Sequence, residues 1–126
     1  MEIRRETPIA GPVVKGFAGT GFRVGEGVFP RGVTLAPEAA LEWDAPATVA
    51  ELTPEMVAGL LAIEPPPEFL LLGTGPRLAQ PPRTFVAALE ARGIGVEAMD
   101  SRAAARAWGV LRQEERWIVA ALMPLG

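Results

Sequence analysis

The alternation of apolar and polar residues predicts a first half that is rich in β-strands. Short apolar runs at 13–17 and 22–24 flank the segment Ala18-Gly19-Thr20-Gly21, which indicates a hairpin with a loose glycine turn. The runs at 28–29 and 32–35 continue this pattern, and Pro30 restricts one of them to a sheet edge or a bend.

The second half opens with a predicted helix and a buried strand. Thr53 supplies a hydroxyl cap, and Pro54 and Glu55 suit the first turn of a helix that ends at the prolines of 65–67. The apolar face of this helix carries Met56, Val57, Leu60, Leu61 and Ile63. The run at 69–72 is apolar throughout, as expected of a buried strand.

Two further helices alternate with two further strands. A helix is expected over about 82–92, a strand over 94–99, and a helix capped by Asp100 or Ser101 after it. The third helix carries an apolar stripe of Ala104, Ala107, Trp108 and Leu111. With a last strand over 116–123, the order predicts an α/β sheet containing at least one parallel βαβ unit.

Composition excludes several classes of function. The 126 residues fit one domain, 1–126, and 12 basic against 15 acidic residues give no basic stretch for nucleic acid. Without histidine, cysteine or tyrosine, the Ser-His-Asp and Cys-His nucleophiles and the zinc sites built on His and Cys are impossible. Ser101 is the only serine, Lys15 is the only lysine, and the carboxylates show no metal-ligand spacing. We therefore expect no catalytic residues, no metal and no cofactor.

Membrane and export signals are not predicted. The longest apolar run, 117–123, is far shorter than the roughly 20 residues that a membrane span needs. The first six residues carry mixed charge and no apolar core follows them, so we expect no signal peptide and a cytoplasmic protein.

The segment Gly73-Thr74-Gly75, here called the glycine loop, is the best local candidate for a ligand site. Glycines after a buried strand let the backbone approach a phosphate. A third glycine is missing, and Pro76-Arg77 stands where a helix would begin, so a plain tight turn is the favoured interpretation.

Asp100 and Ser101 offer a second candidate position. If their strand runs parallel to 69–72, they lie beside the glycine loop at the carboxyl edge of the sheet, where α/β proteins bind ligands. Arg77, Arg102 or Arg106 would then meet an anion. The alternative, which we favour because such caps are common, is a helix N-cap with solvated arginines.

The three tryptophans differ in their sequence context. The helical spacing of Trp108 indicates a core position, and the apolar strand around Trp117 indicates either a core or a sheet-face position. Trp43 has no periodic context, so it either covers an end of the core or anchors a partner protein.

Four stretches of the second half form a recognisable set: FLLLGTG (69–75), LEARGIGVEAMD (89–100), AAARAWGVL (103–111) and VAALMP (119–124). Together they resemble a small family of bacterial and archaeal proteins of unknown function that includes the mitochondrial respiratory complex I assembly factor 3. In the first half, residues 16–24, 43 and 52–55 match more loosely. Ser101 stands where threonine is usual, Trp108 where a smaller aromatic is usual, and Gly109 where asparagine is usual.

The resemblance implies a three-layer (β+α/β/α) domain, in which the central sheet is mixed and the first half adds a β layer. It also implies a non-enzymatic role in assembling a membrane complex through protein partners, and it brings no catalytic residues.

A non-catalytic interaction or assembly module is therefore the leading hypothesis. The alternative is a small-ligand or anion-binding domain, possibly an enzyme, that uses the crevice between the glycine loop and Asp100-Ser101. A polar concavity there would favour a ligand, and an exposed apolar surface that includes Trp43 would favour a partner.

Overall fold

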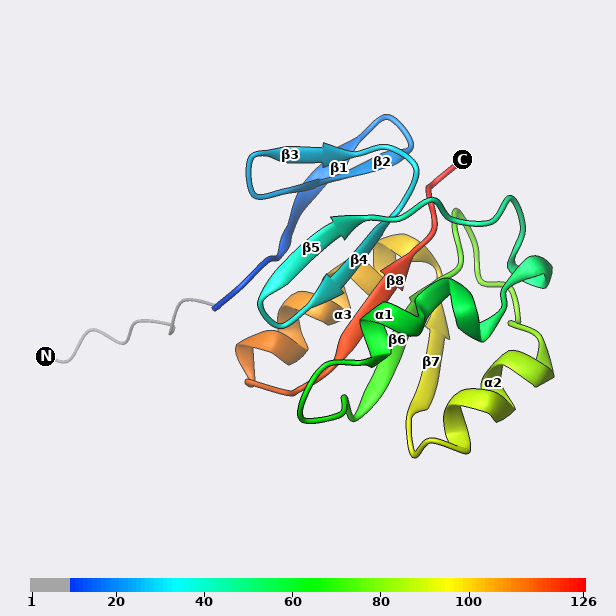
Figure 1. Ribbon diagram of the computed structural model, residues 1–126. Coiled ribbons are helices and arrows are strands. Elements are labelled where there is room, and N and C mark those ends of the chain that lie inside the picture. Colours follow the sequence, from blue (N-terminus) through cyan, green and yellow to red (C-terminus); the bar gives the residue numbers. More distant parts are fainter. Residues whose placement is uncertain (1–9) are drawn as a thin grey trace, which may run out of the picture.

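Two β-sheets and a set of short helices build the fold (Figure 1). The computed structural model describes residues 10–126. A small antiparallel sheet has the strand order β1 (Val14–Ala18), β2 (Gly21–Val24), β3 (Gly27–Phe29). The central sheet has the order β5 (Ala39–Glu42), β4 (Val33–Ala36), β8 (Val119–Leu122), β6 (Phe69–Gly73), β7 (Gly95–Met99).

The central sheet is mixed, as the resemblance implied. Strand β6 runs parallel to both β7 and β8, whereas β4 pairs antiparallel with β8 and β5. In the described part of the chain, three α-helices accompany the sheets: α1 (Ala58–Leu61), α2 (Arg83–Glu90) and α3 (Ser101–Gln113). Two 3-10 helices precede α1, namely η1 (Val49–Glu51) and η2 (Pro54–Val57).

Alternate residues of the central strands pack into two separate hydrophobic cores, one on each face of the central sheet. The sheet and the elements that cover its two faces form three layers. Leu71 faces Trp108 of α3 and Phe22 of the small sheet. Leu70 and Leu72 face the opposite core, which α1, α2 and the 3-10 helices cover. Figure 1 shows α3 on one side of the sheet and α1 on the other. Strand β6 is apolar throughout because both of its faces are buried.

The helix predicted from Thr53 differs from the observed one. It splits into η2 and a four-residue α1, and the Thr53 hydroxyl makes no cap hydrogen bond. The tighter 3-10 winding rotates Met56 out of the apolar face, so its side chain is 40% exposed while Val57 and Leu61 stay buried. The last strand spans Val119–Leu122 and is shorter than predicted, because the Arg116 N–H still donates to the Leu111 carbonyl of α3 at 3.0 Å.

No helix within residues 10–126 combines the length and apolar character that a membrane crossing needs.

Candidate functional site

The glycine loop and the start of α3 lie together at one edge of the central sheet. Parallel pairing of β6 with β7 brings their carboxyl ends side by side. The Thr74 N–H donates to the Met99 carbonyl at 2.9 Å, and the Ser101 N–H donates to the Gly75 carbonyl at 2.8 Å. The structure thus brings together the two segments that the sequence suggested as a ligand site.

Hydrogen bonds close the space between these two segments. Ser101 is 0% exposed, and its hydroxyl donates to the Met123 carbonyl at 2.6 Å and accepts the Gly75 N–H at 2.8 Å. A side chain at Gly73 would place its Cβ 2.7 Å from the Ser101 Oγ, so only glycine fits there. The Thr74 hydroxyl lies 2.8 Å from the Arg77 carbonyl and accepts the Ala79 N–H at 3.1 Å. Both hydroxyl groups therefore bind main-chain atoms of the protein itself.

The remaining residues suggested by the sequence have other surroundings. Asp100 caps α3, because its Oδ1 accepts the Ala103 N–H at 2.9 Å, which confirms the capping interpretation. The Arg102 guanidinium lies 4.7 Å from the centre of the Phe17 ring. Arg106 is exposed on α3.

A wide groove of about 830 Å³ borders the glycine loop. Residues 74–77, segment 44–50 and the residues Met123, Pro124 and Gly126 contribute to its lining. Arg31, Asp44 and Arg77 are its charged residues, and Asp100, Ser101 and Arg106 do not line it. Sequence reasoning missed this groove because segment 44–50 has no periodicity that would place it beside the loop.

A second, apolar groove of about 390 Å³ lies between the edge of the central sheet and α1. We call it the Leu41 groove, and its lining is Thr34, Ala36, Ala39, Leu41, Glu42, Trp43, Met56, Val57, Gly59, Leu60 and Ile63. The β4–β5 register pairs Thr34 with Leu41 and Ala36 with Ala39, which sets these four side chains on one face of the sheet. Leu41 is 66% exposed there.

Trp43 forms a wall of this groove and does not project from the surface. Its side chain is buried, and its indole N–H donates to the Met56 carbonyl at 3.1 Å. This bond ties η2 to the end of β5 and presents Met56 beside Leu41. The large apolar side chains that stand exposed at the groove are therefore Leu41 and Met56, which the sequence pattern did not single out as functional.

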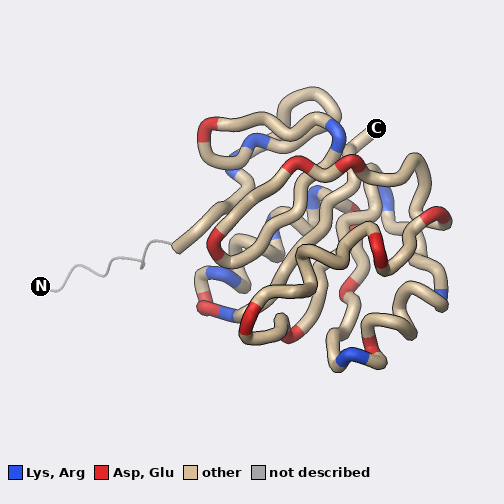
Figure 2. Tube along the Cα trace, in the orientation of Figure 1, with Lys and Arg blue, Asp and Glu red and all other residues tan. Residues whose placement is uncertain are grey.

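The segment that builds the Leu41 groove is acidic. Between Gly32 and Pro76 the chain has no lysine or arginine, and its carboxylates are Glu38, Glu42, Asp44, Glu51, Glu55, Glu64 and Glu68. In the described part of the chain, ion pairs involve only Glu42, with Arg31 at 3.4 Å, and Glu68, with Arg116 at 2.9 Å. Figure 2 shows acidic positions at both ends of β5. The groove therefore lies in a negative field.

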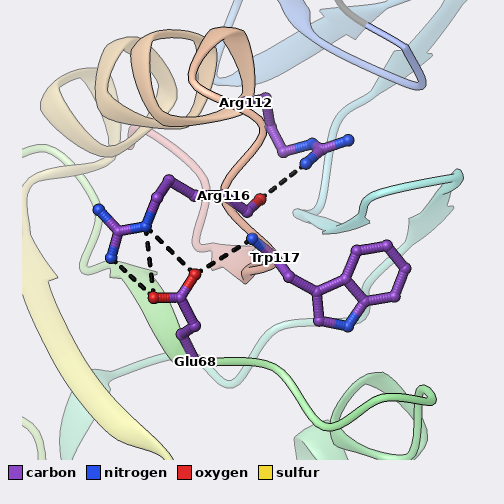
Figure 3. Close-up of polar contacts among 4 residues, drawn as sticks. All are labelled: Glu68, Arg112, Arg116 and Trp117. Atoms are coloured by element: carbon purple, nitrogen blue, oxygen red, sulfur yellow. Dashed lines mark hydrogen bonds and ion pairs between the residues drawn. The ribbon is translucent and has the colours of Figure 1, made fainter.

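The Glu68–Arg116 pair lies at the end of the sheet opposite the glycine loop, where the inner strands β6 and β8 begin (Figure 3). The Glu68 carboxylate also accepts the Trp117 N–H at 3.3 Å, and Arg112 donates to the Arg116 carbonyl at 2.7 Å. Hydrogen bonding and attraction from Arg116 lower the pKa of Glu68, and Glu68 raises the pKa of Arg116. These contacts hold the beginnings of two strands together, and the two charged side chains of the pair bind each other.

Residues 14–123 match the family described as "Protein of unknown function (DUF498/DUF598)". The chain belongs to this family. The match confirms the resemblance seen in the sequence.

Three relatives are similar over nearly the whole chain. An uncharacterised Rhodobacter capsulatus protein is 32% identical over 96% of this chain and 92% of its own length. NADH dehydrogenase (ubiquinone) 1 alpha subcomplex assembly factor 3 of Danio rerio is 28% identical over 98% of this chain and 71% of its own length. A Bordetella pertussis protein, solved in solution as an Mth938-like domain, is 31% identical, with a TM-score of 0.80 over 100% of this chain and 94% of its own. The three-layer fold is thus that of known relatives.

Proposed function

We propose that this protein is a non-catalytic interaction module that holds a partner protein at the Leu41 groove, in the manner of an assembly factor. The observation that carries the proposal is the pair of exposed apolar side chains, Leu41 and Met56, beside a formed apolar groove. Apolar side chains gathered in a concave surface mark sites of protein contact. The name of the zebrafish relative, an assembly factor, supports the same role.

The chemistry of the chain supports a role without catalysis. The sequence has no histidine, cysteine or tyrosine, so the common nucleophile–base pairs are missing. Its single serine is buried, and its hydroxyl is bound to the main chain of Met123 and Gly75. The pKa shifts of Glu68 and Arg116 arise from their mutual ion pair, which lies where strands β6 and β8 begin and does not line the Leu41 groove.

The test is recovery of partners from the native cell with the tagged full chain, followed by mass spectrometry of soluble and membrane fractions. Leu41→Gln removes the apolar contact without changing charge. Val110→Gln is the matched control, because Val110 is 61% exposed on α3 and does not line the groove. We expect a reproducible partner set that falls about tenfold with Leu41→Gln, the loss of one interface anchor, and persists with Val110→Gln. Recovery of the same partner proteins in equal amounts by both variants would contradict the proposal. Enzymatic turnover of a substrate that depends on Asp100 or Ser101 would contradict it as well.

The wide groove beside the glycine loop favours a second candidate function, the binding of a small anion. Its lining includes the side chains of Arg31, which also contacts Glu42 at 3.4 Å, and Arg77. Thermal unfolding of the protein with inorganic phosphate and with a panel of anionic metabolites tests this candidate. A stabilisation that disappears in Arg77→Ala supports it, and an unchanged melting temperature with every compound removes it.

A further inference from the structure

We propose that the open edge of β5 accepts an extended segment of the partner protein as an added antiparallel strand. Alternate apolar side chains of that segment enter the Leu41 groove, and lysine or arginine residues flank them. This inference rests on the proposed function and names the kind of partner segment that the groove binds.

The first argument is the outer edge of the central sheet. Among the strands of residues 10–126, β5 is the outermost on its side, and the strand paired with it is β4. The Trp43 N–H donates to the Gly32 carbonyl at 3.0 Å, which makes Gly32 and Trp43 a hydrogen-bonded pair. Because such pairs alternate along an antiparallel ladder, the N–H and C=O groups of Ala40 and Glu42 point away from β4. These groups form a template for another strand.

The second argument is the face on which the groove lies. An added strand runs about 4.8 Å from β5, with successive side chains on opposite faces of the sheet. The residue opposite Leu41, and those two positions away, project onto the face that carries Leu41, Met56 and the groove. A segment with apolar residues at every second position therefore covers both exposed side chains and fills the groove. Main-chain hydrogen bonds supply affinity in this arrangement, and the groove supplies specificity.

The third argument is charge. Glu38 and Glu42 stand at the two ends of β5, and Glu55 and Glu64 adjoin the groove residues Met56 and Ile63. The cation that contacts these carboxylates in the described structure is Arg31, on Glu42. This field attracts basic segments and repels a second copy of the same edge, because like charges placed opposite each other across an interface are unfavourable. The charge pattern therefore selects a basic partner segment over self-association.

The other edge strands lack one or more of these features. Strand β7 at the opposite edge of the central sheet and strand β1 at an edge of the small sheet include no large exposed apolar side chain. Strand β3 carries the exposed Val28 but spans three residues. Among the described strands, β5 is the one that combines an open edge, an apolar groove and flanking carboxylates.

The first experiment is selection of random 12-residue peptides by display against the full-length protein, with Leu41→Gln as the counter-target. The inference predicts peptides with apolar residues at i, i+2 and i+4, enriched in lysine and arginine and depleted of acidic residues. Apolar spacing at i, i+3 and i+4 would instead identify a helix in the groove and overturn the inference. Acidic peptides, or equal enrichment on Leu41→Gln, would overturn it as well.

The second experiment examines the main chain directly with the best selected peptide. We expect amide hydrogen exchange at Ala40 and Glu42 to slow at least tenfold on binding. N-methylation of the peptide residues that face β5 is expected to weaken binding at least tenfold, whereas N-methylation of the intervening residues has little effect. Equal effects of the two methylation patterns would contradict strand addition. Protection of the same amides without peptide, together with a dimer in sedimentation, would assign the edge to a second copy and overturn the inference.

The peptide and cell experiments separate this inference from the function on which it rests. Native partners that depend on Leu41, together with failure to select any basic extended peptide, would overturn strand addition and leave the interaction role standing. If binding of neither native partners nor peptides depends on Leu41, both the strand-addition inference and the proposed interaction role are overturned.

Discussion

Replacing Ser101 with alanine removes one oxygen atom from a buried junction of three chain segments. The hydroxyl joins the glycine loop, through the Gly75 N–H at 2.8 Å, to the end of β8, through the Met123 carbonyl at 2.6 Å. Ser101 itself lies at the start of α3 and is 0% exposed. The substitution therefore leaves one donor and one acceptor of the main chain buried without partners.

The expected loss of stability follows from these two groups. A buried group that loses its hydrogen-bond partner costs about 1–3 kcal/mol. A water molecule in the space left by the hydroxyl would restore part of this, so we expect a loss of about 2–4 kcal/mol for the pair. Because each kcal/mol changes the melting temperature of a domain of this size by roughly 3–5 °C, the melting temperature is expected to fall by about 10 °C.

Urea unfolding followed by circular dichroism measures this loss as a shift in midpoint at constant slope. Thr84→Ala is the control, because Thr84 is exposed on α2 and its change is expected to stay within about 0.5 kcal/mol. If Ser101→Ala also stays within about 0.5 kcal/mol of the wild type, the glycine loop and β8 do not depend on this hydroxyl. The structural interpretation of the loop would then be wrong.

Three further substitutions test other parts of the structure. Gly73→Ala is expected to lower the free energy of unfolding by at least about 2 kcal/mol, since its Cβ would lie 2.7 Å from the Ser101 Oγ; an unchanged urea midpoint would contradict this crowding. Trp43→Phe removes the indole bond to the Met56 carbonyl, and a loss of about 1 kcal/mol in the same assay is expected, whereas no loss would show that the bond is dispensable. The lowered pKa of Glu68 means that its ion pair stabilises the fold at neutral pH and that this contribution disappears as acid protonates the carboxylate. The stability difference between wild type and Glu68→Gln should therefore shrink as the pH falls below 4.5, and a difference that grows would refute the assignment.

The sequence predicted the alternating second half of the fold because each element there carries a local signal. The apolar run of β6, the cap at Asp100 and the stripe that includes Trp108 all appear where their patterns indicated. The helical segment after Thr53 begins where the pattern indicated, but its first turn is the 3-10 helix η2, whose winding the local pattern does not contain. The Trp43 indole bond to the Met56 carbonyl of η2 joins residues 13 positions apart.

The candidate sites depended on contacts that no local pattern contains. Adjacency of the glycine loop and Ser101 followed from parallel strands, but the closure of the space between them requires Met123 at the end of β8. The Leu41 groove likewise forms where β5 meets α1, two segments with no shared period. Trp43 was singled out as a possible partner anchor, and the structure places it in the wall beneath Leu41 and Met56.

Photo-crosslinking in the native cell tests the interaction role most directly. A photoreactive phenylalanine derivative replaces Leu41 in one form of the full chain and Val110 in another, since both side chains are largely exposed and lie on different elements. The interaction role predicts a discrete adduct between position 41 and one protein partner, with no matching adduct from position 110. Crosslinks that are absent at position 41, or that are the same at both positions, would contradict a partner-binding groove at the edge of β5.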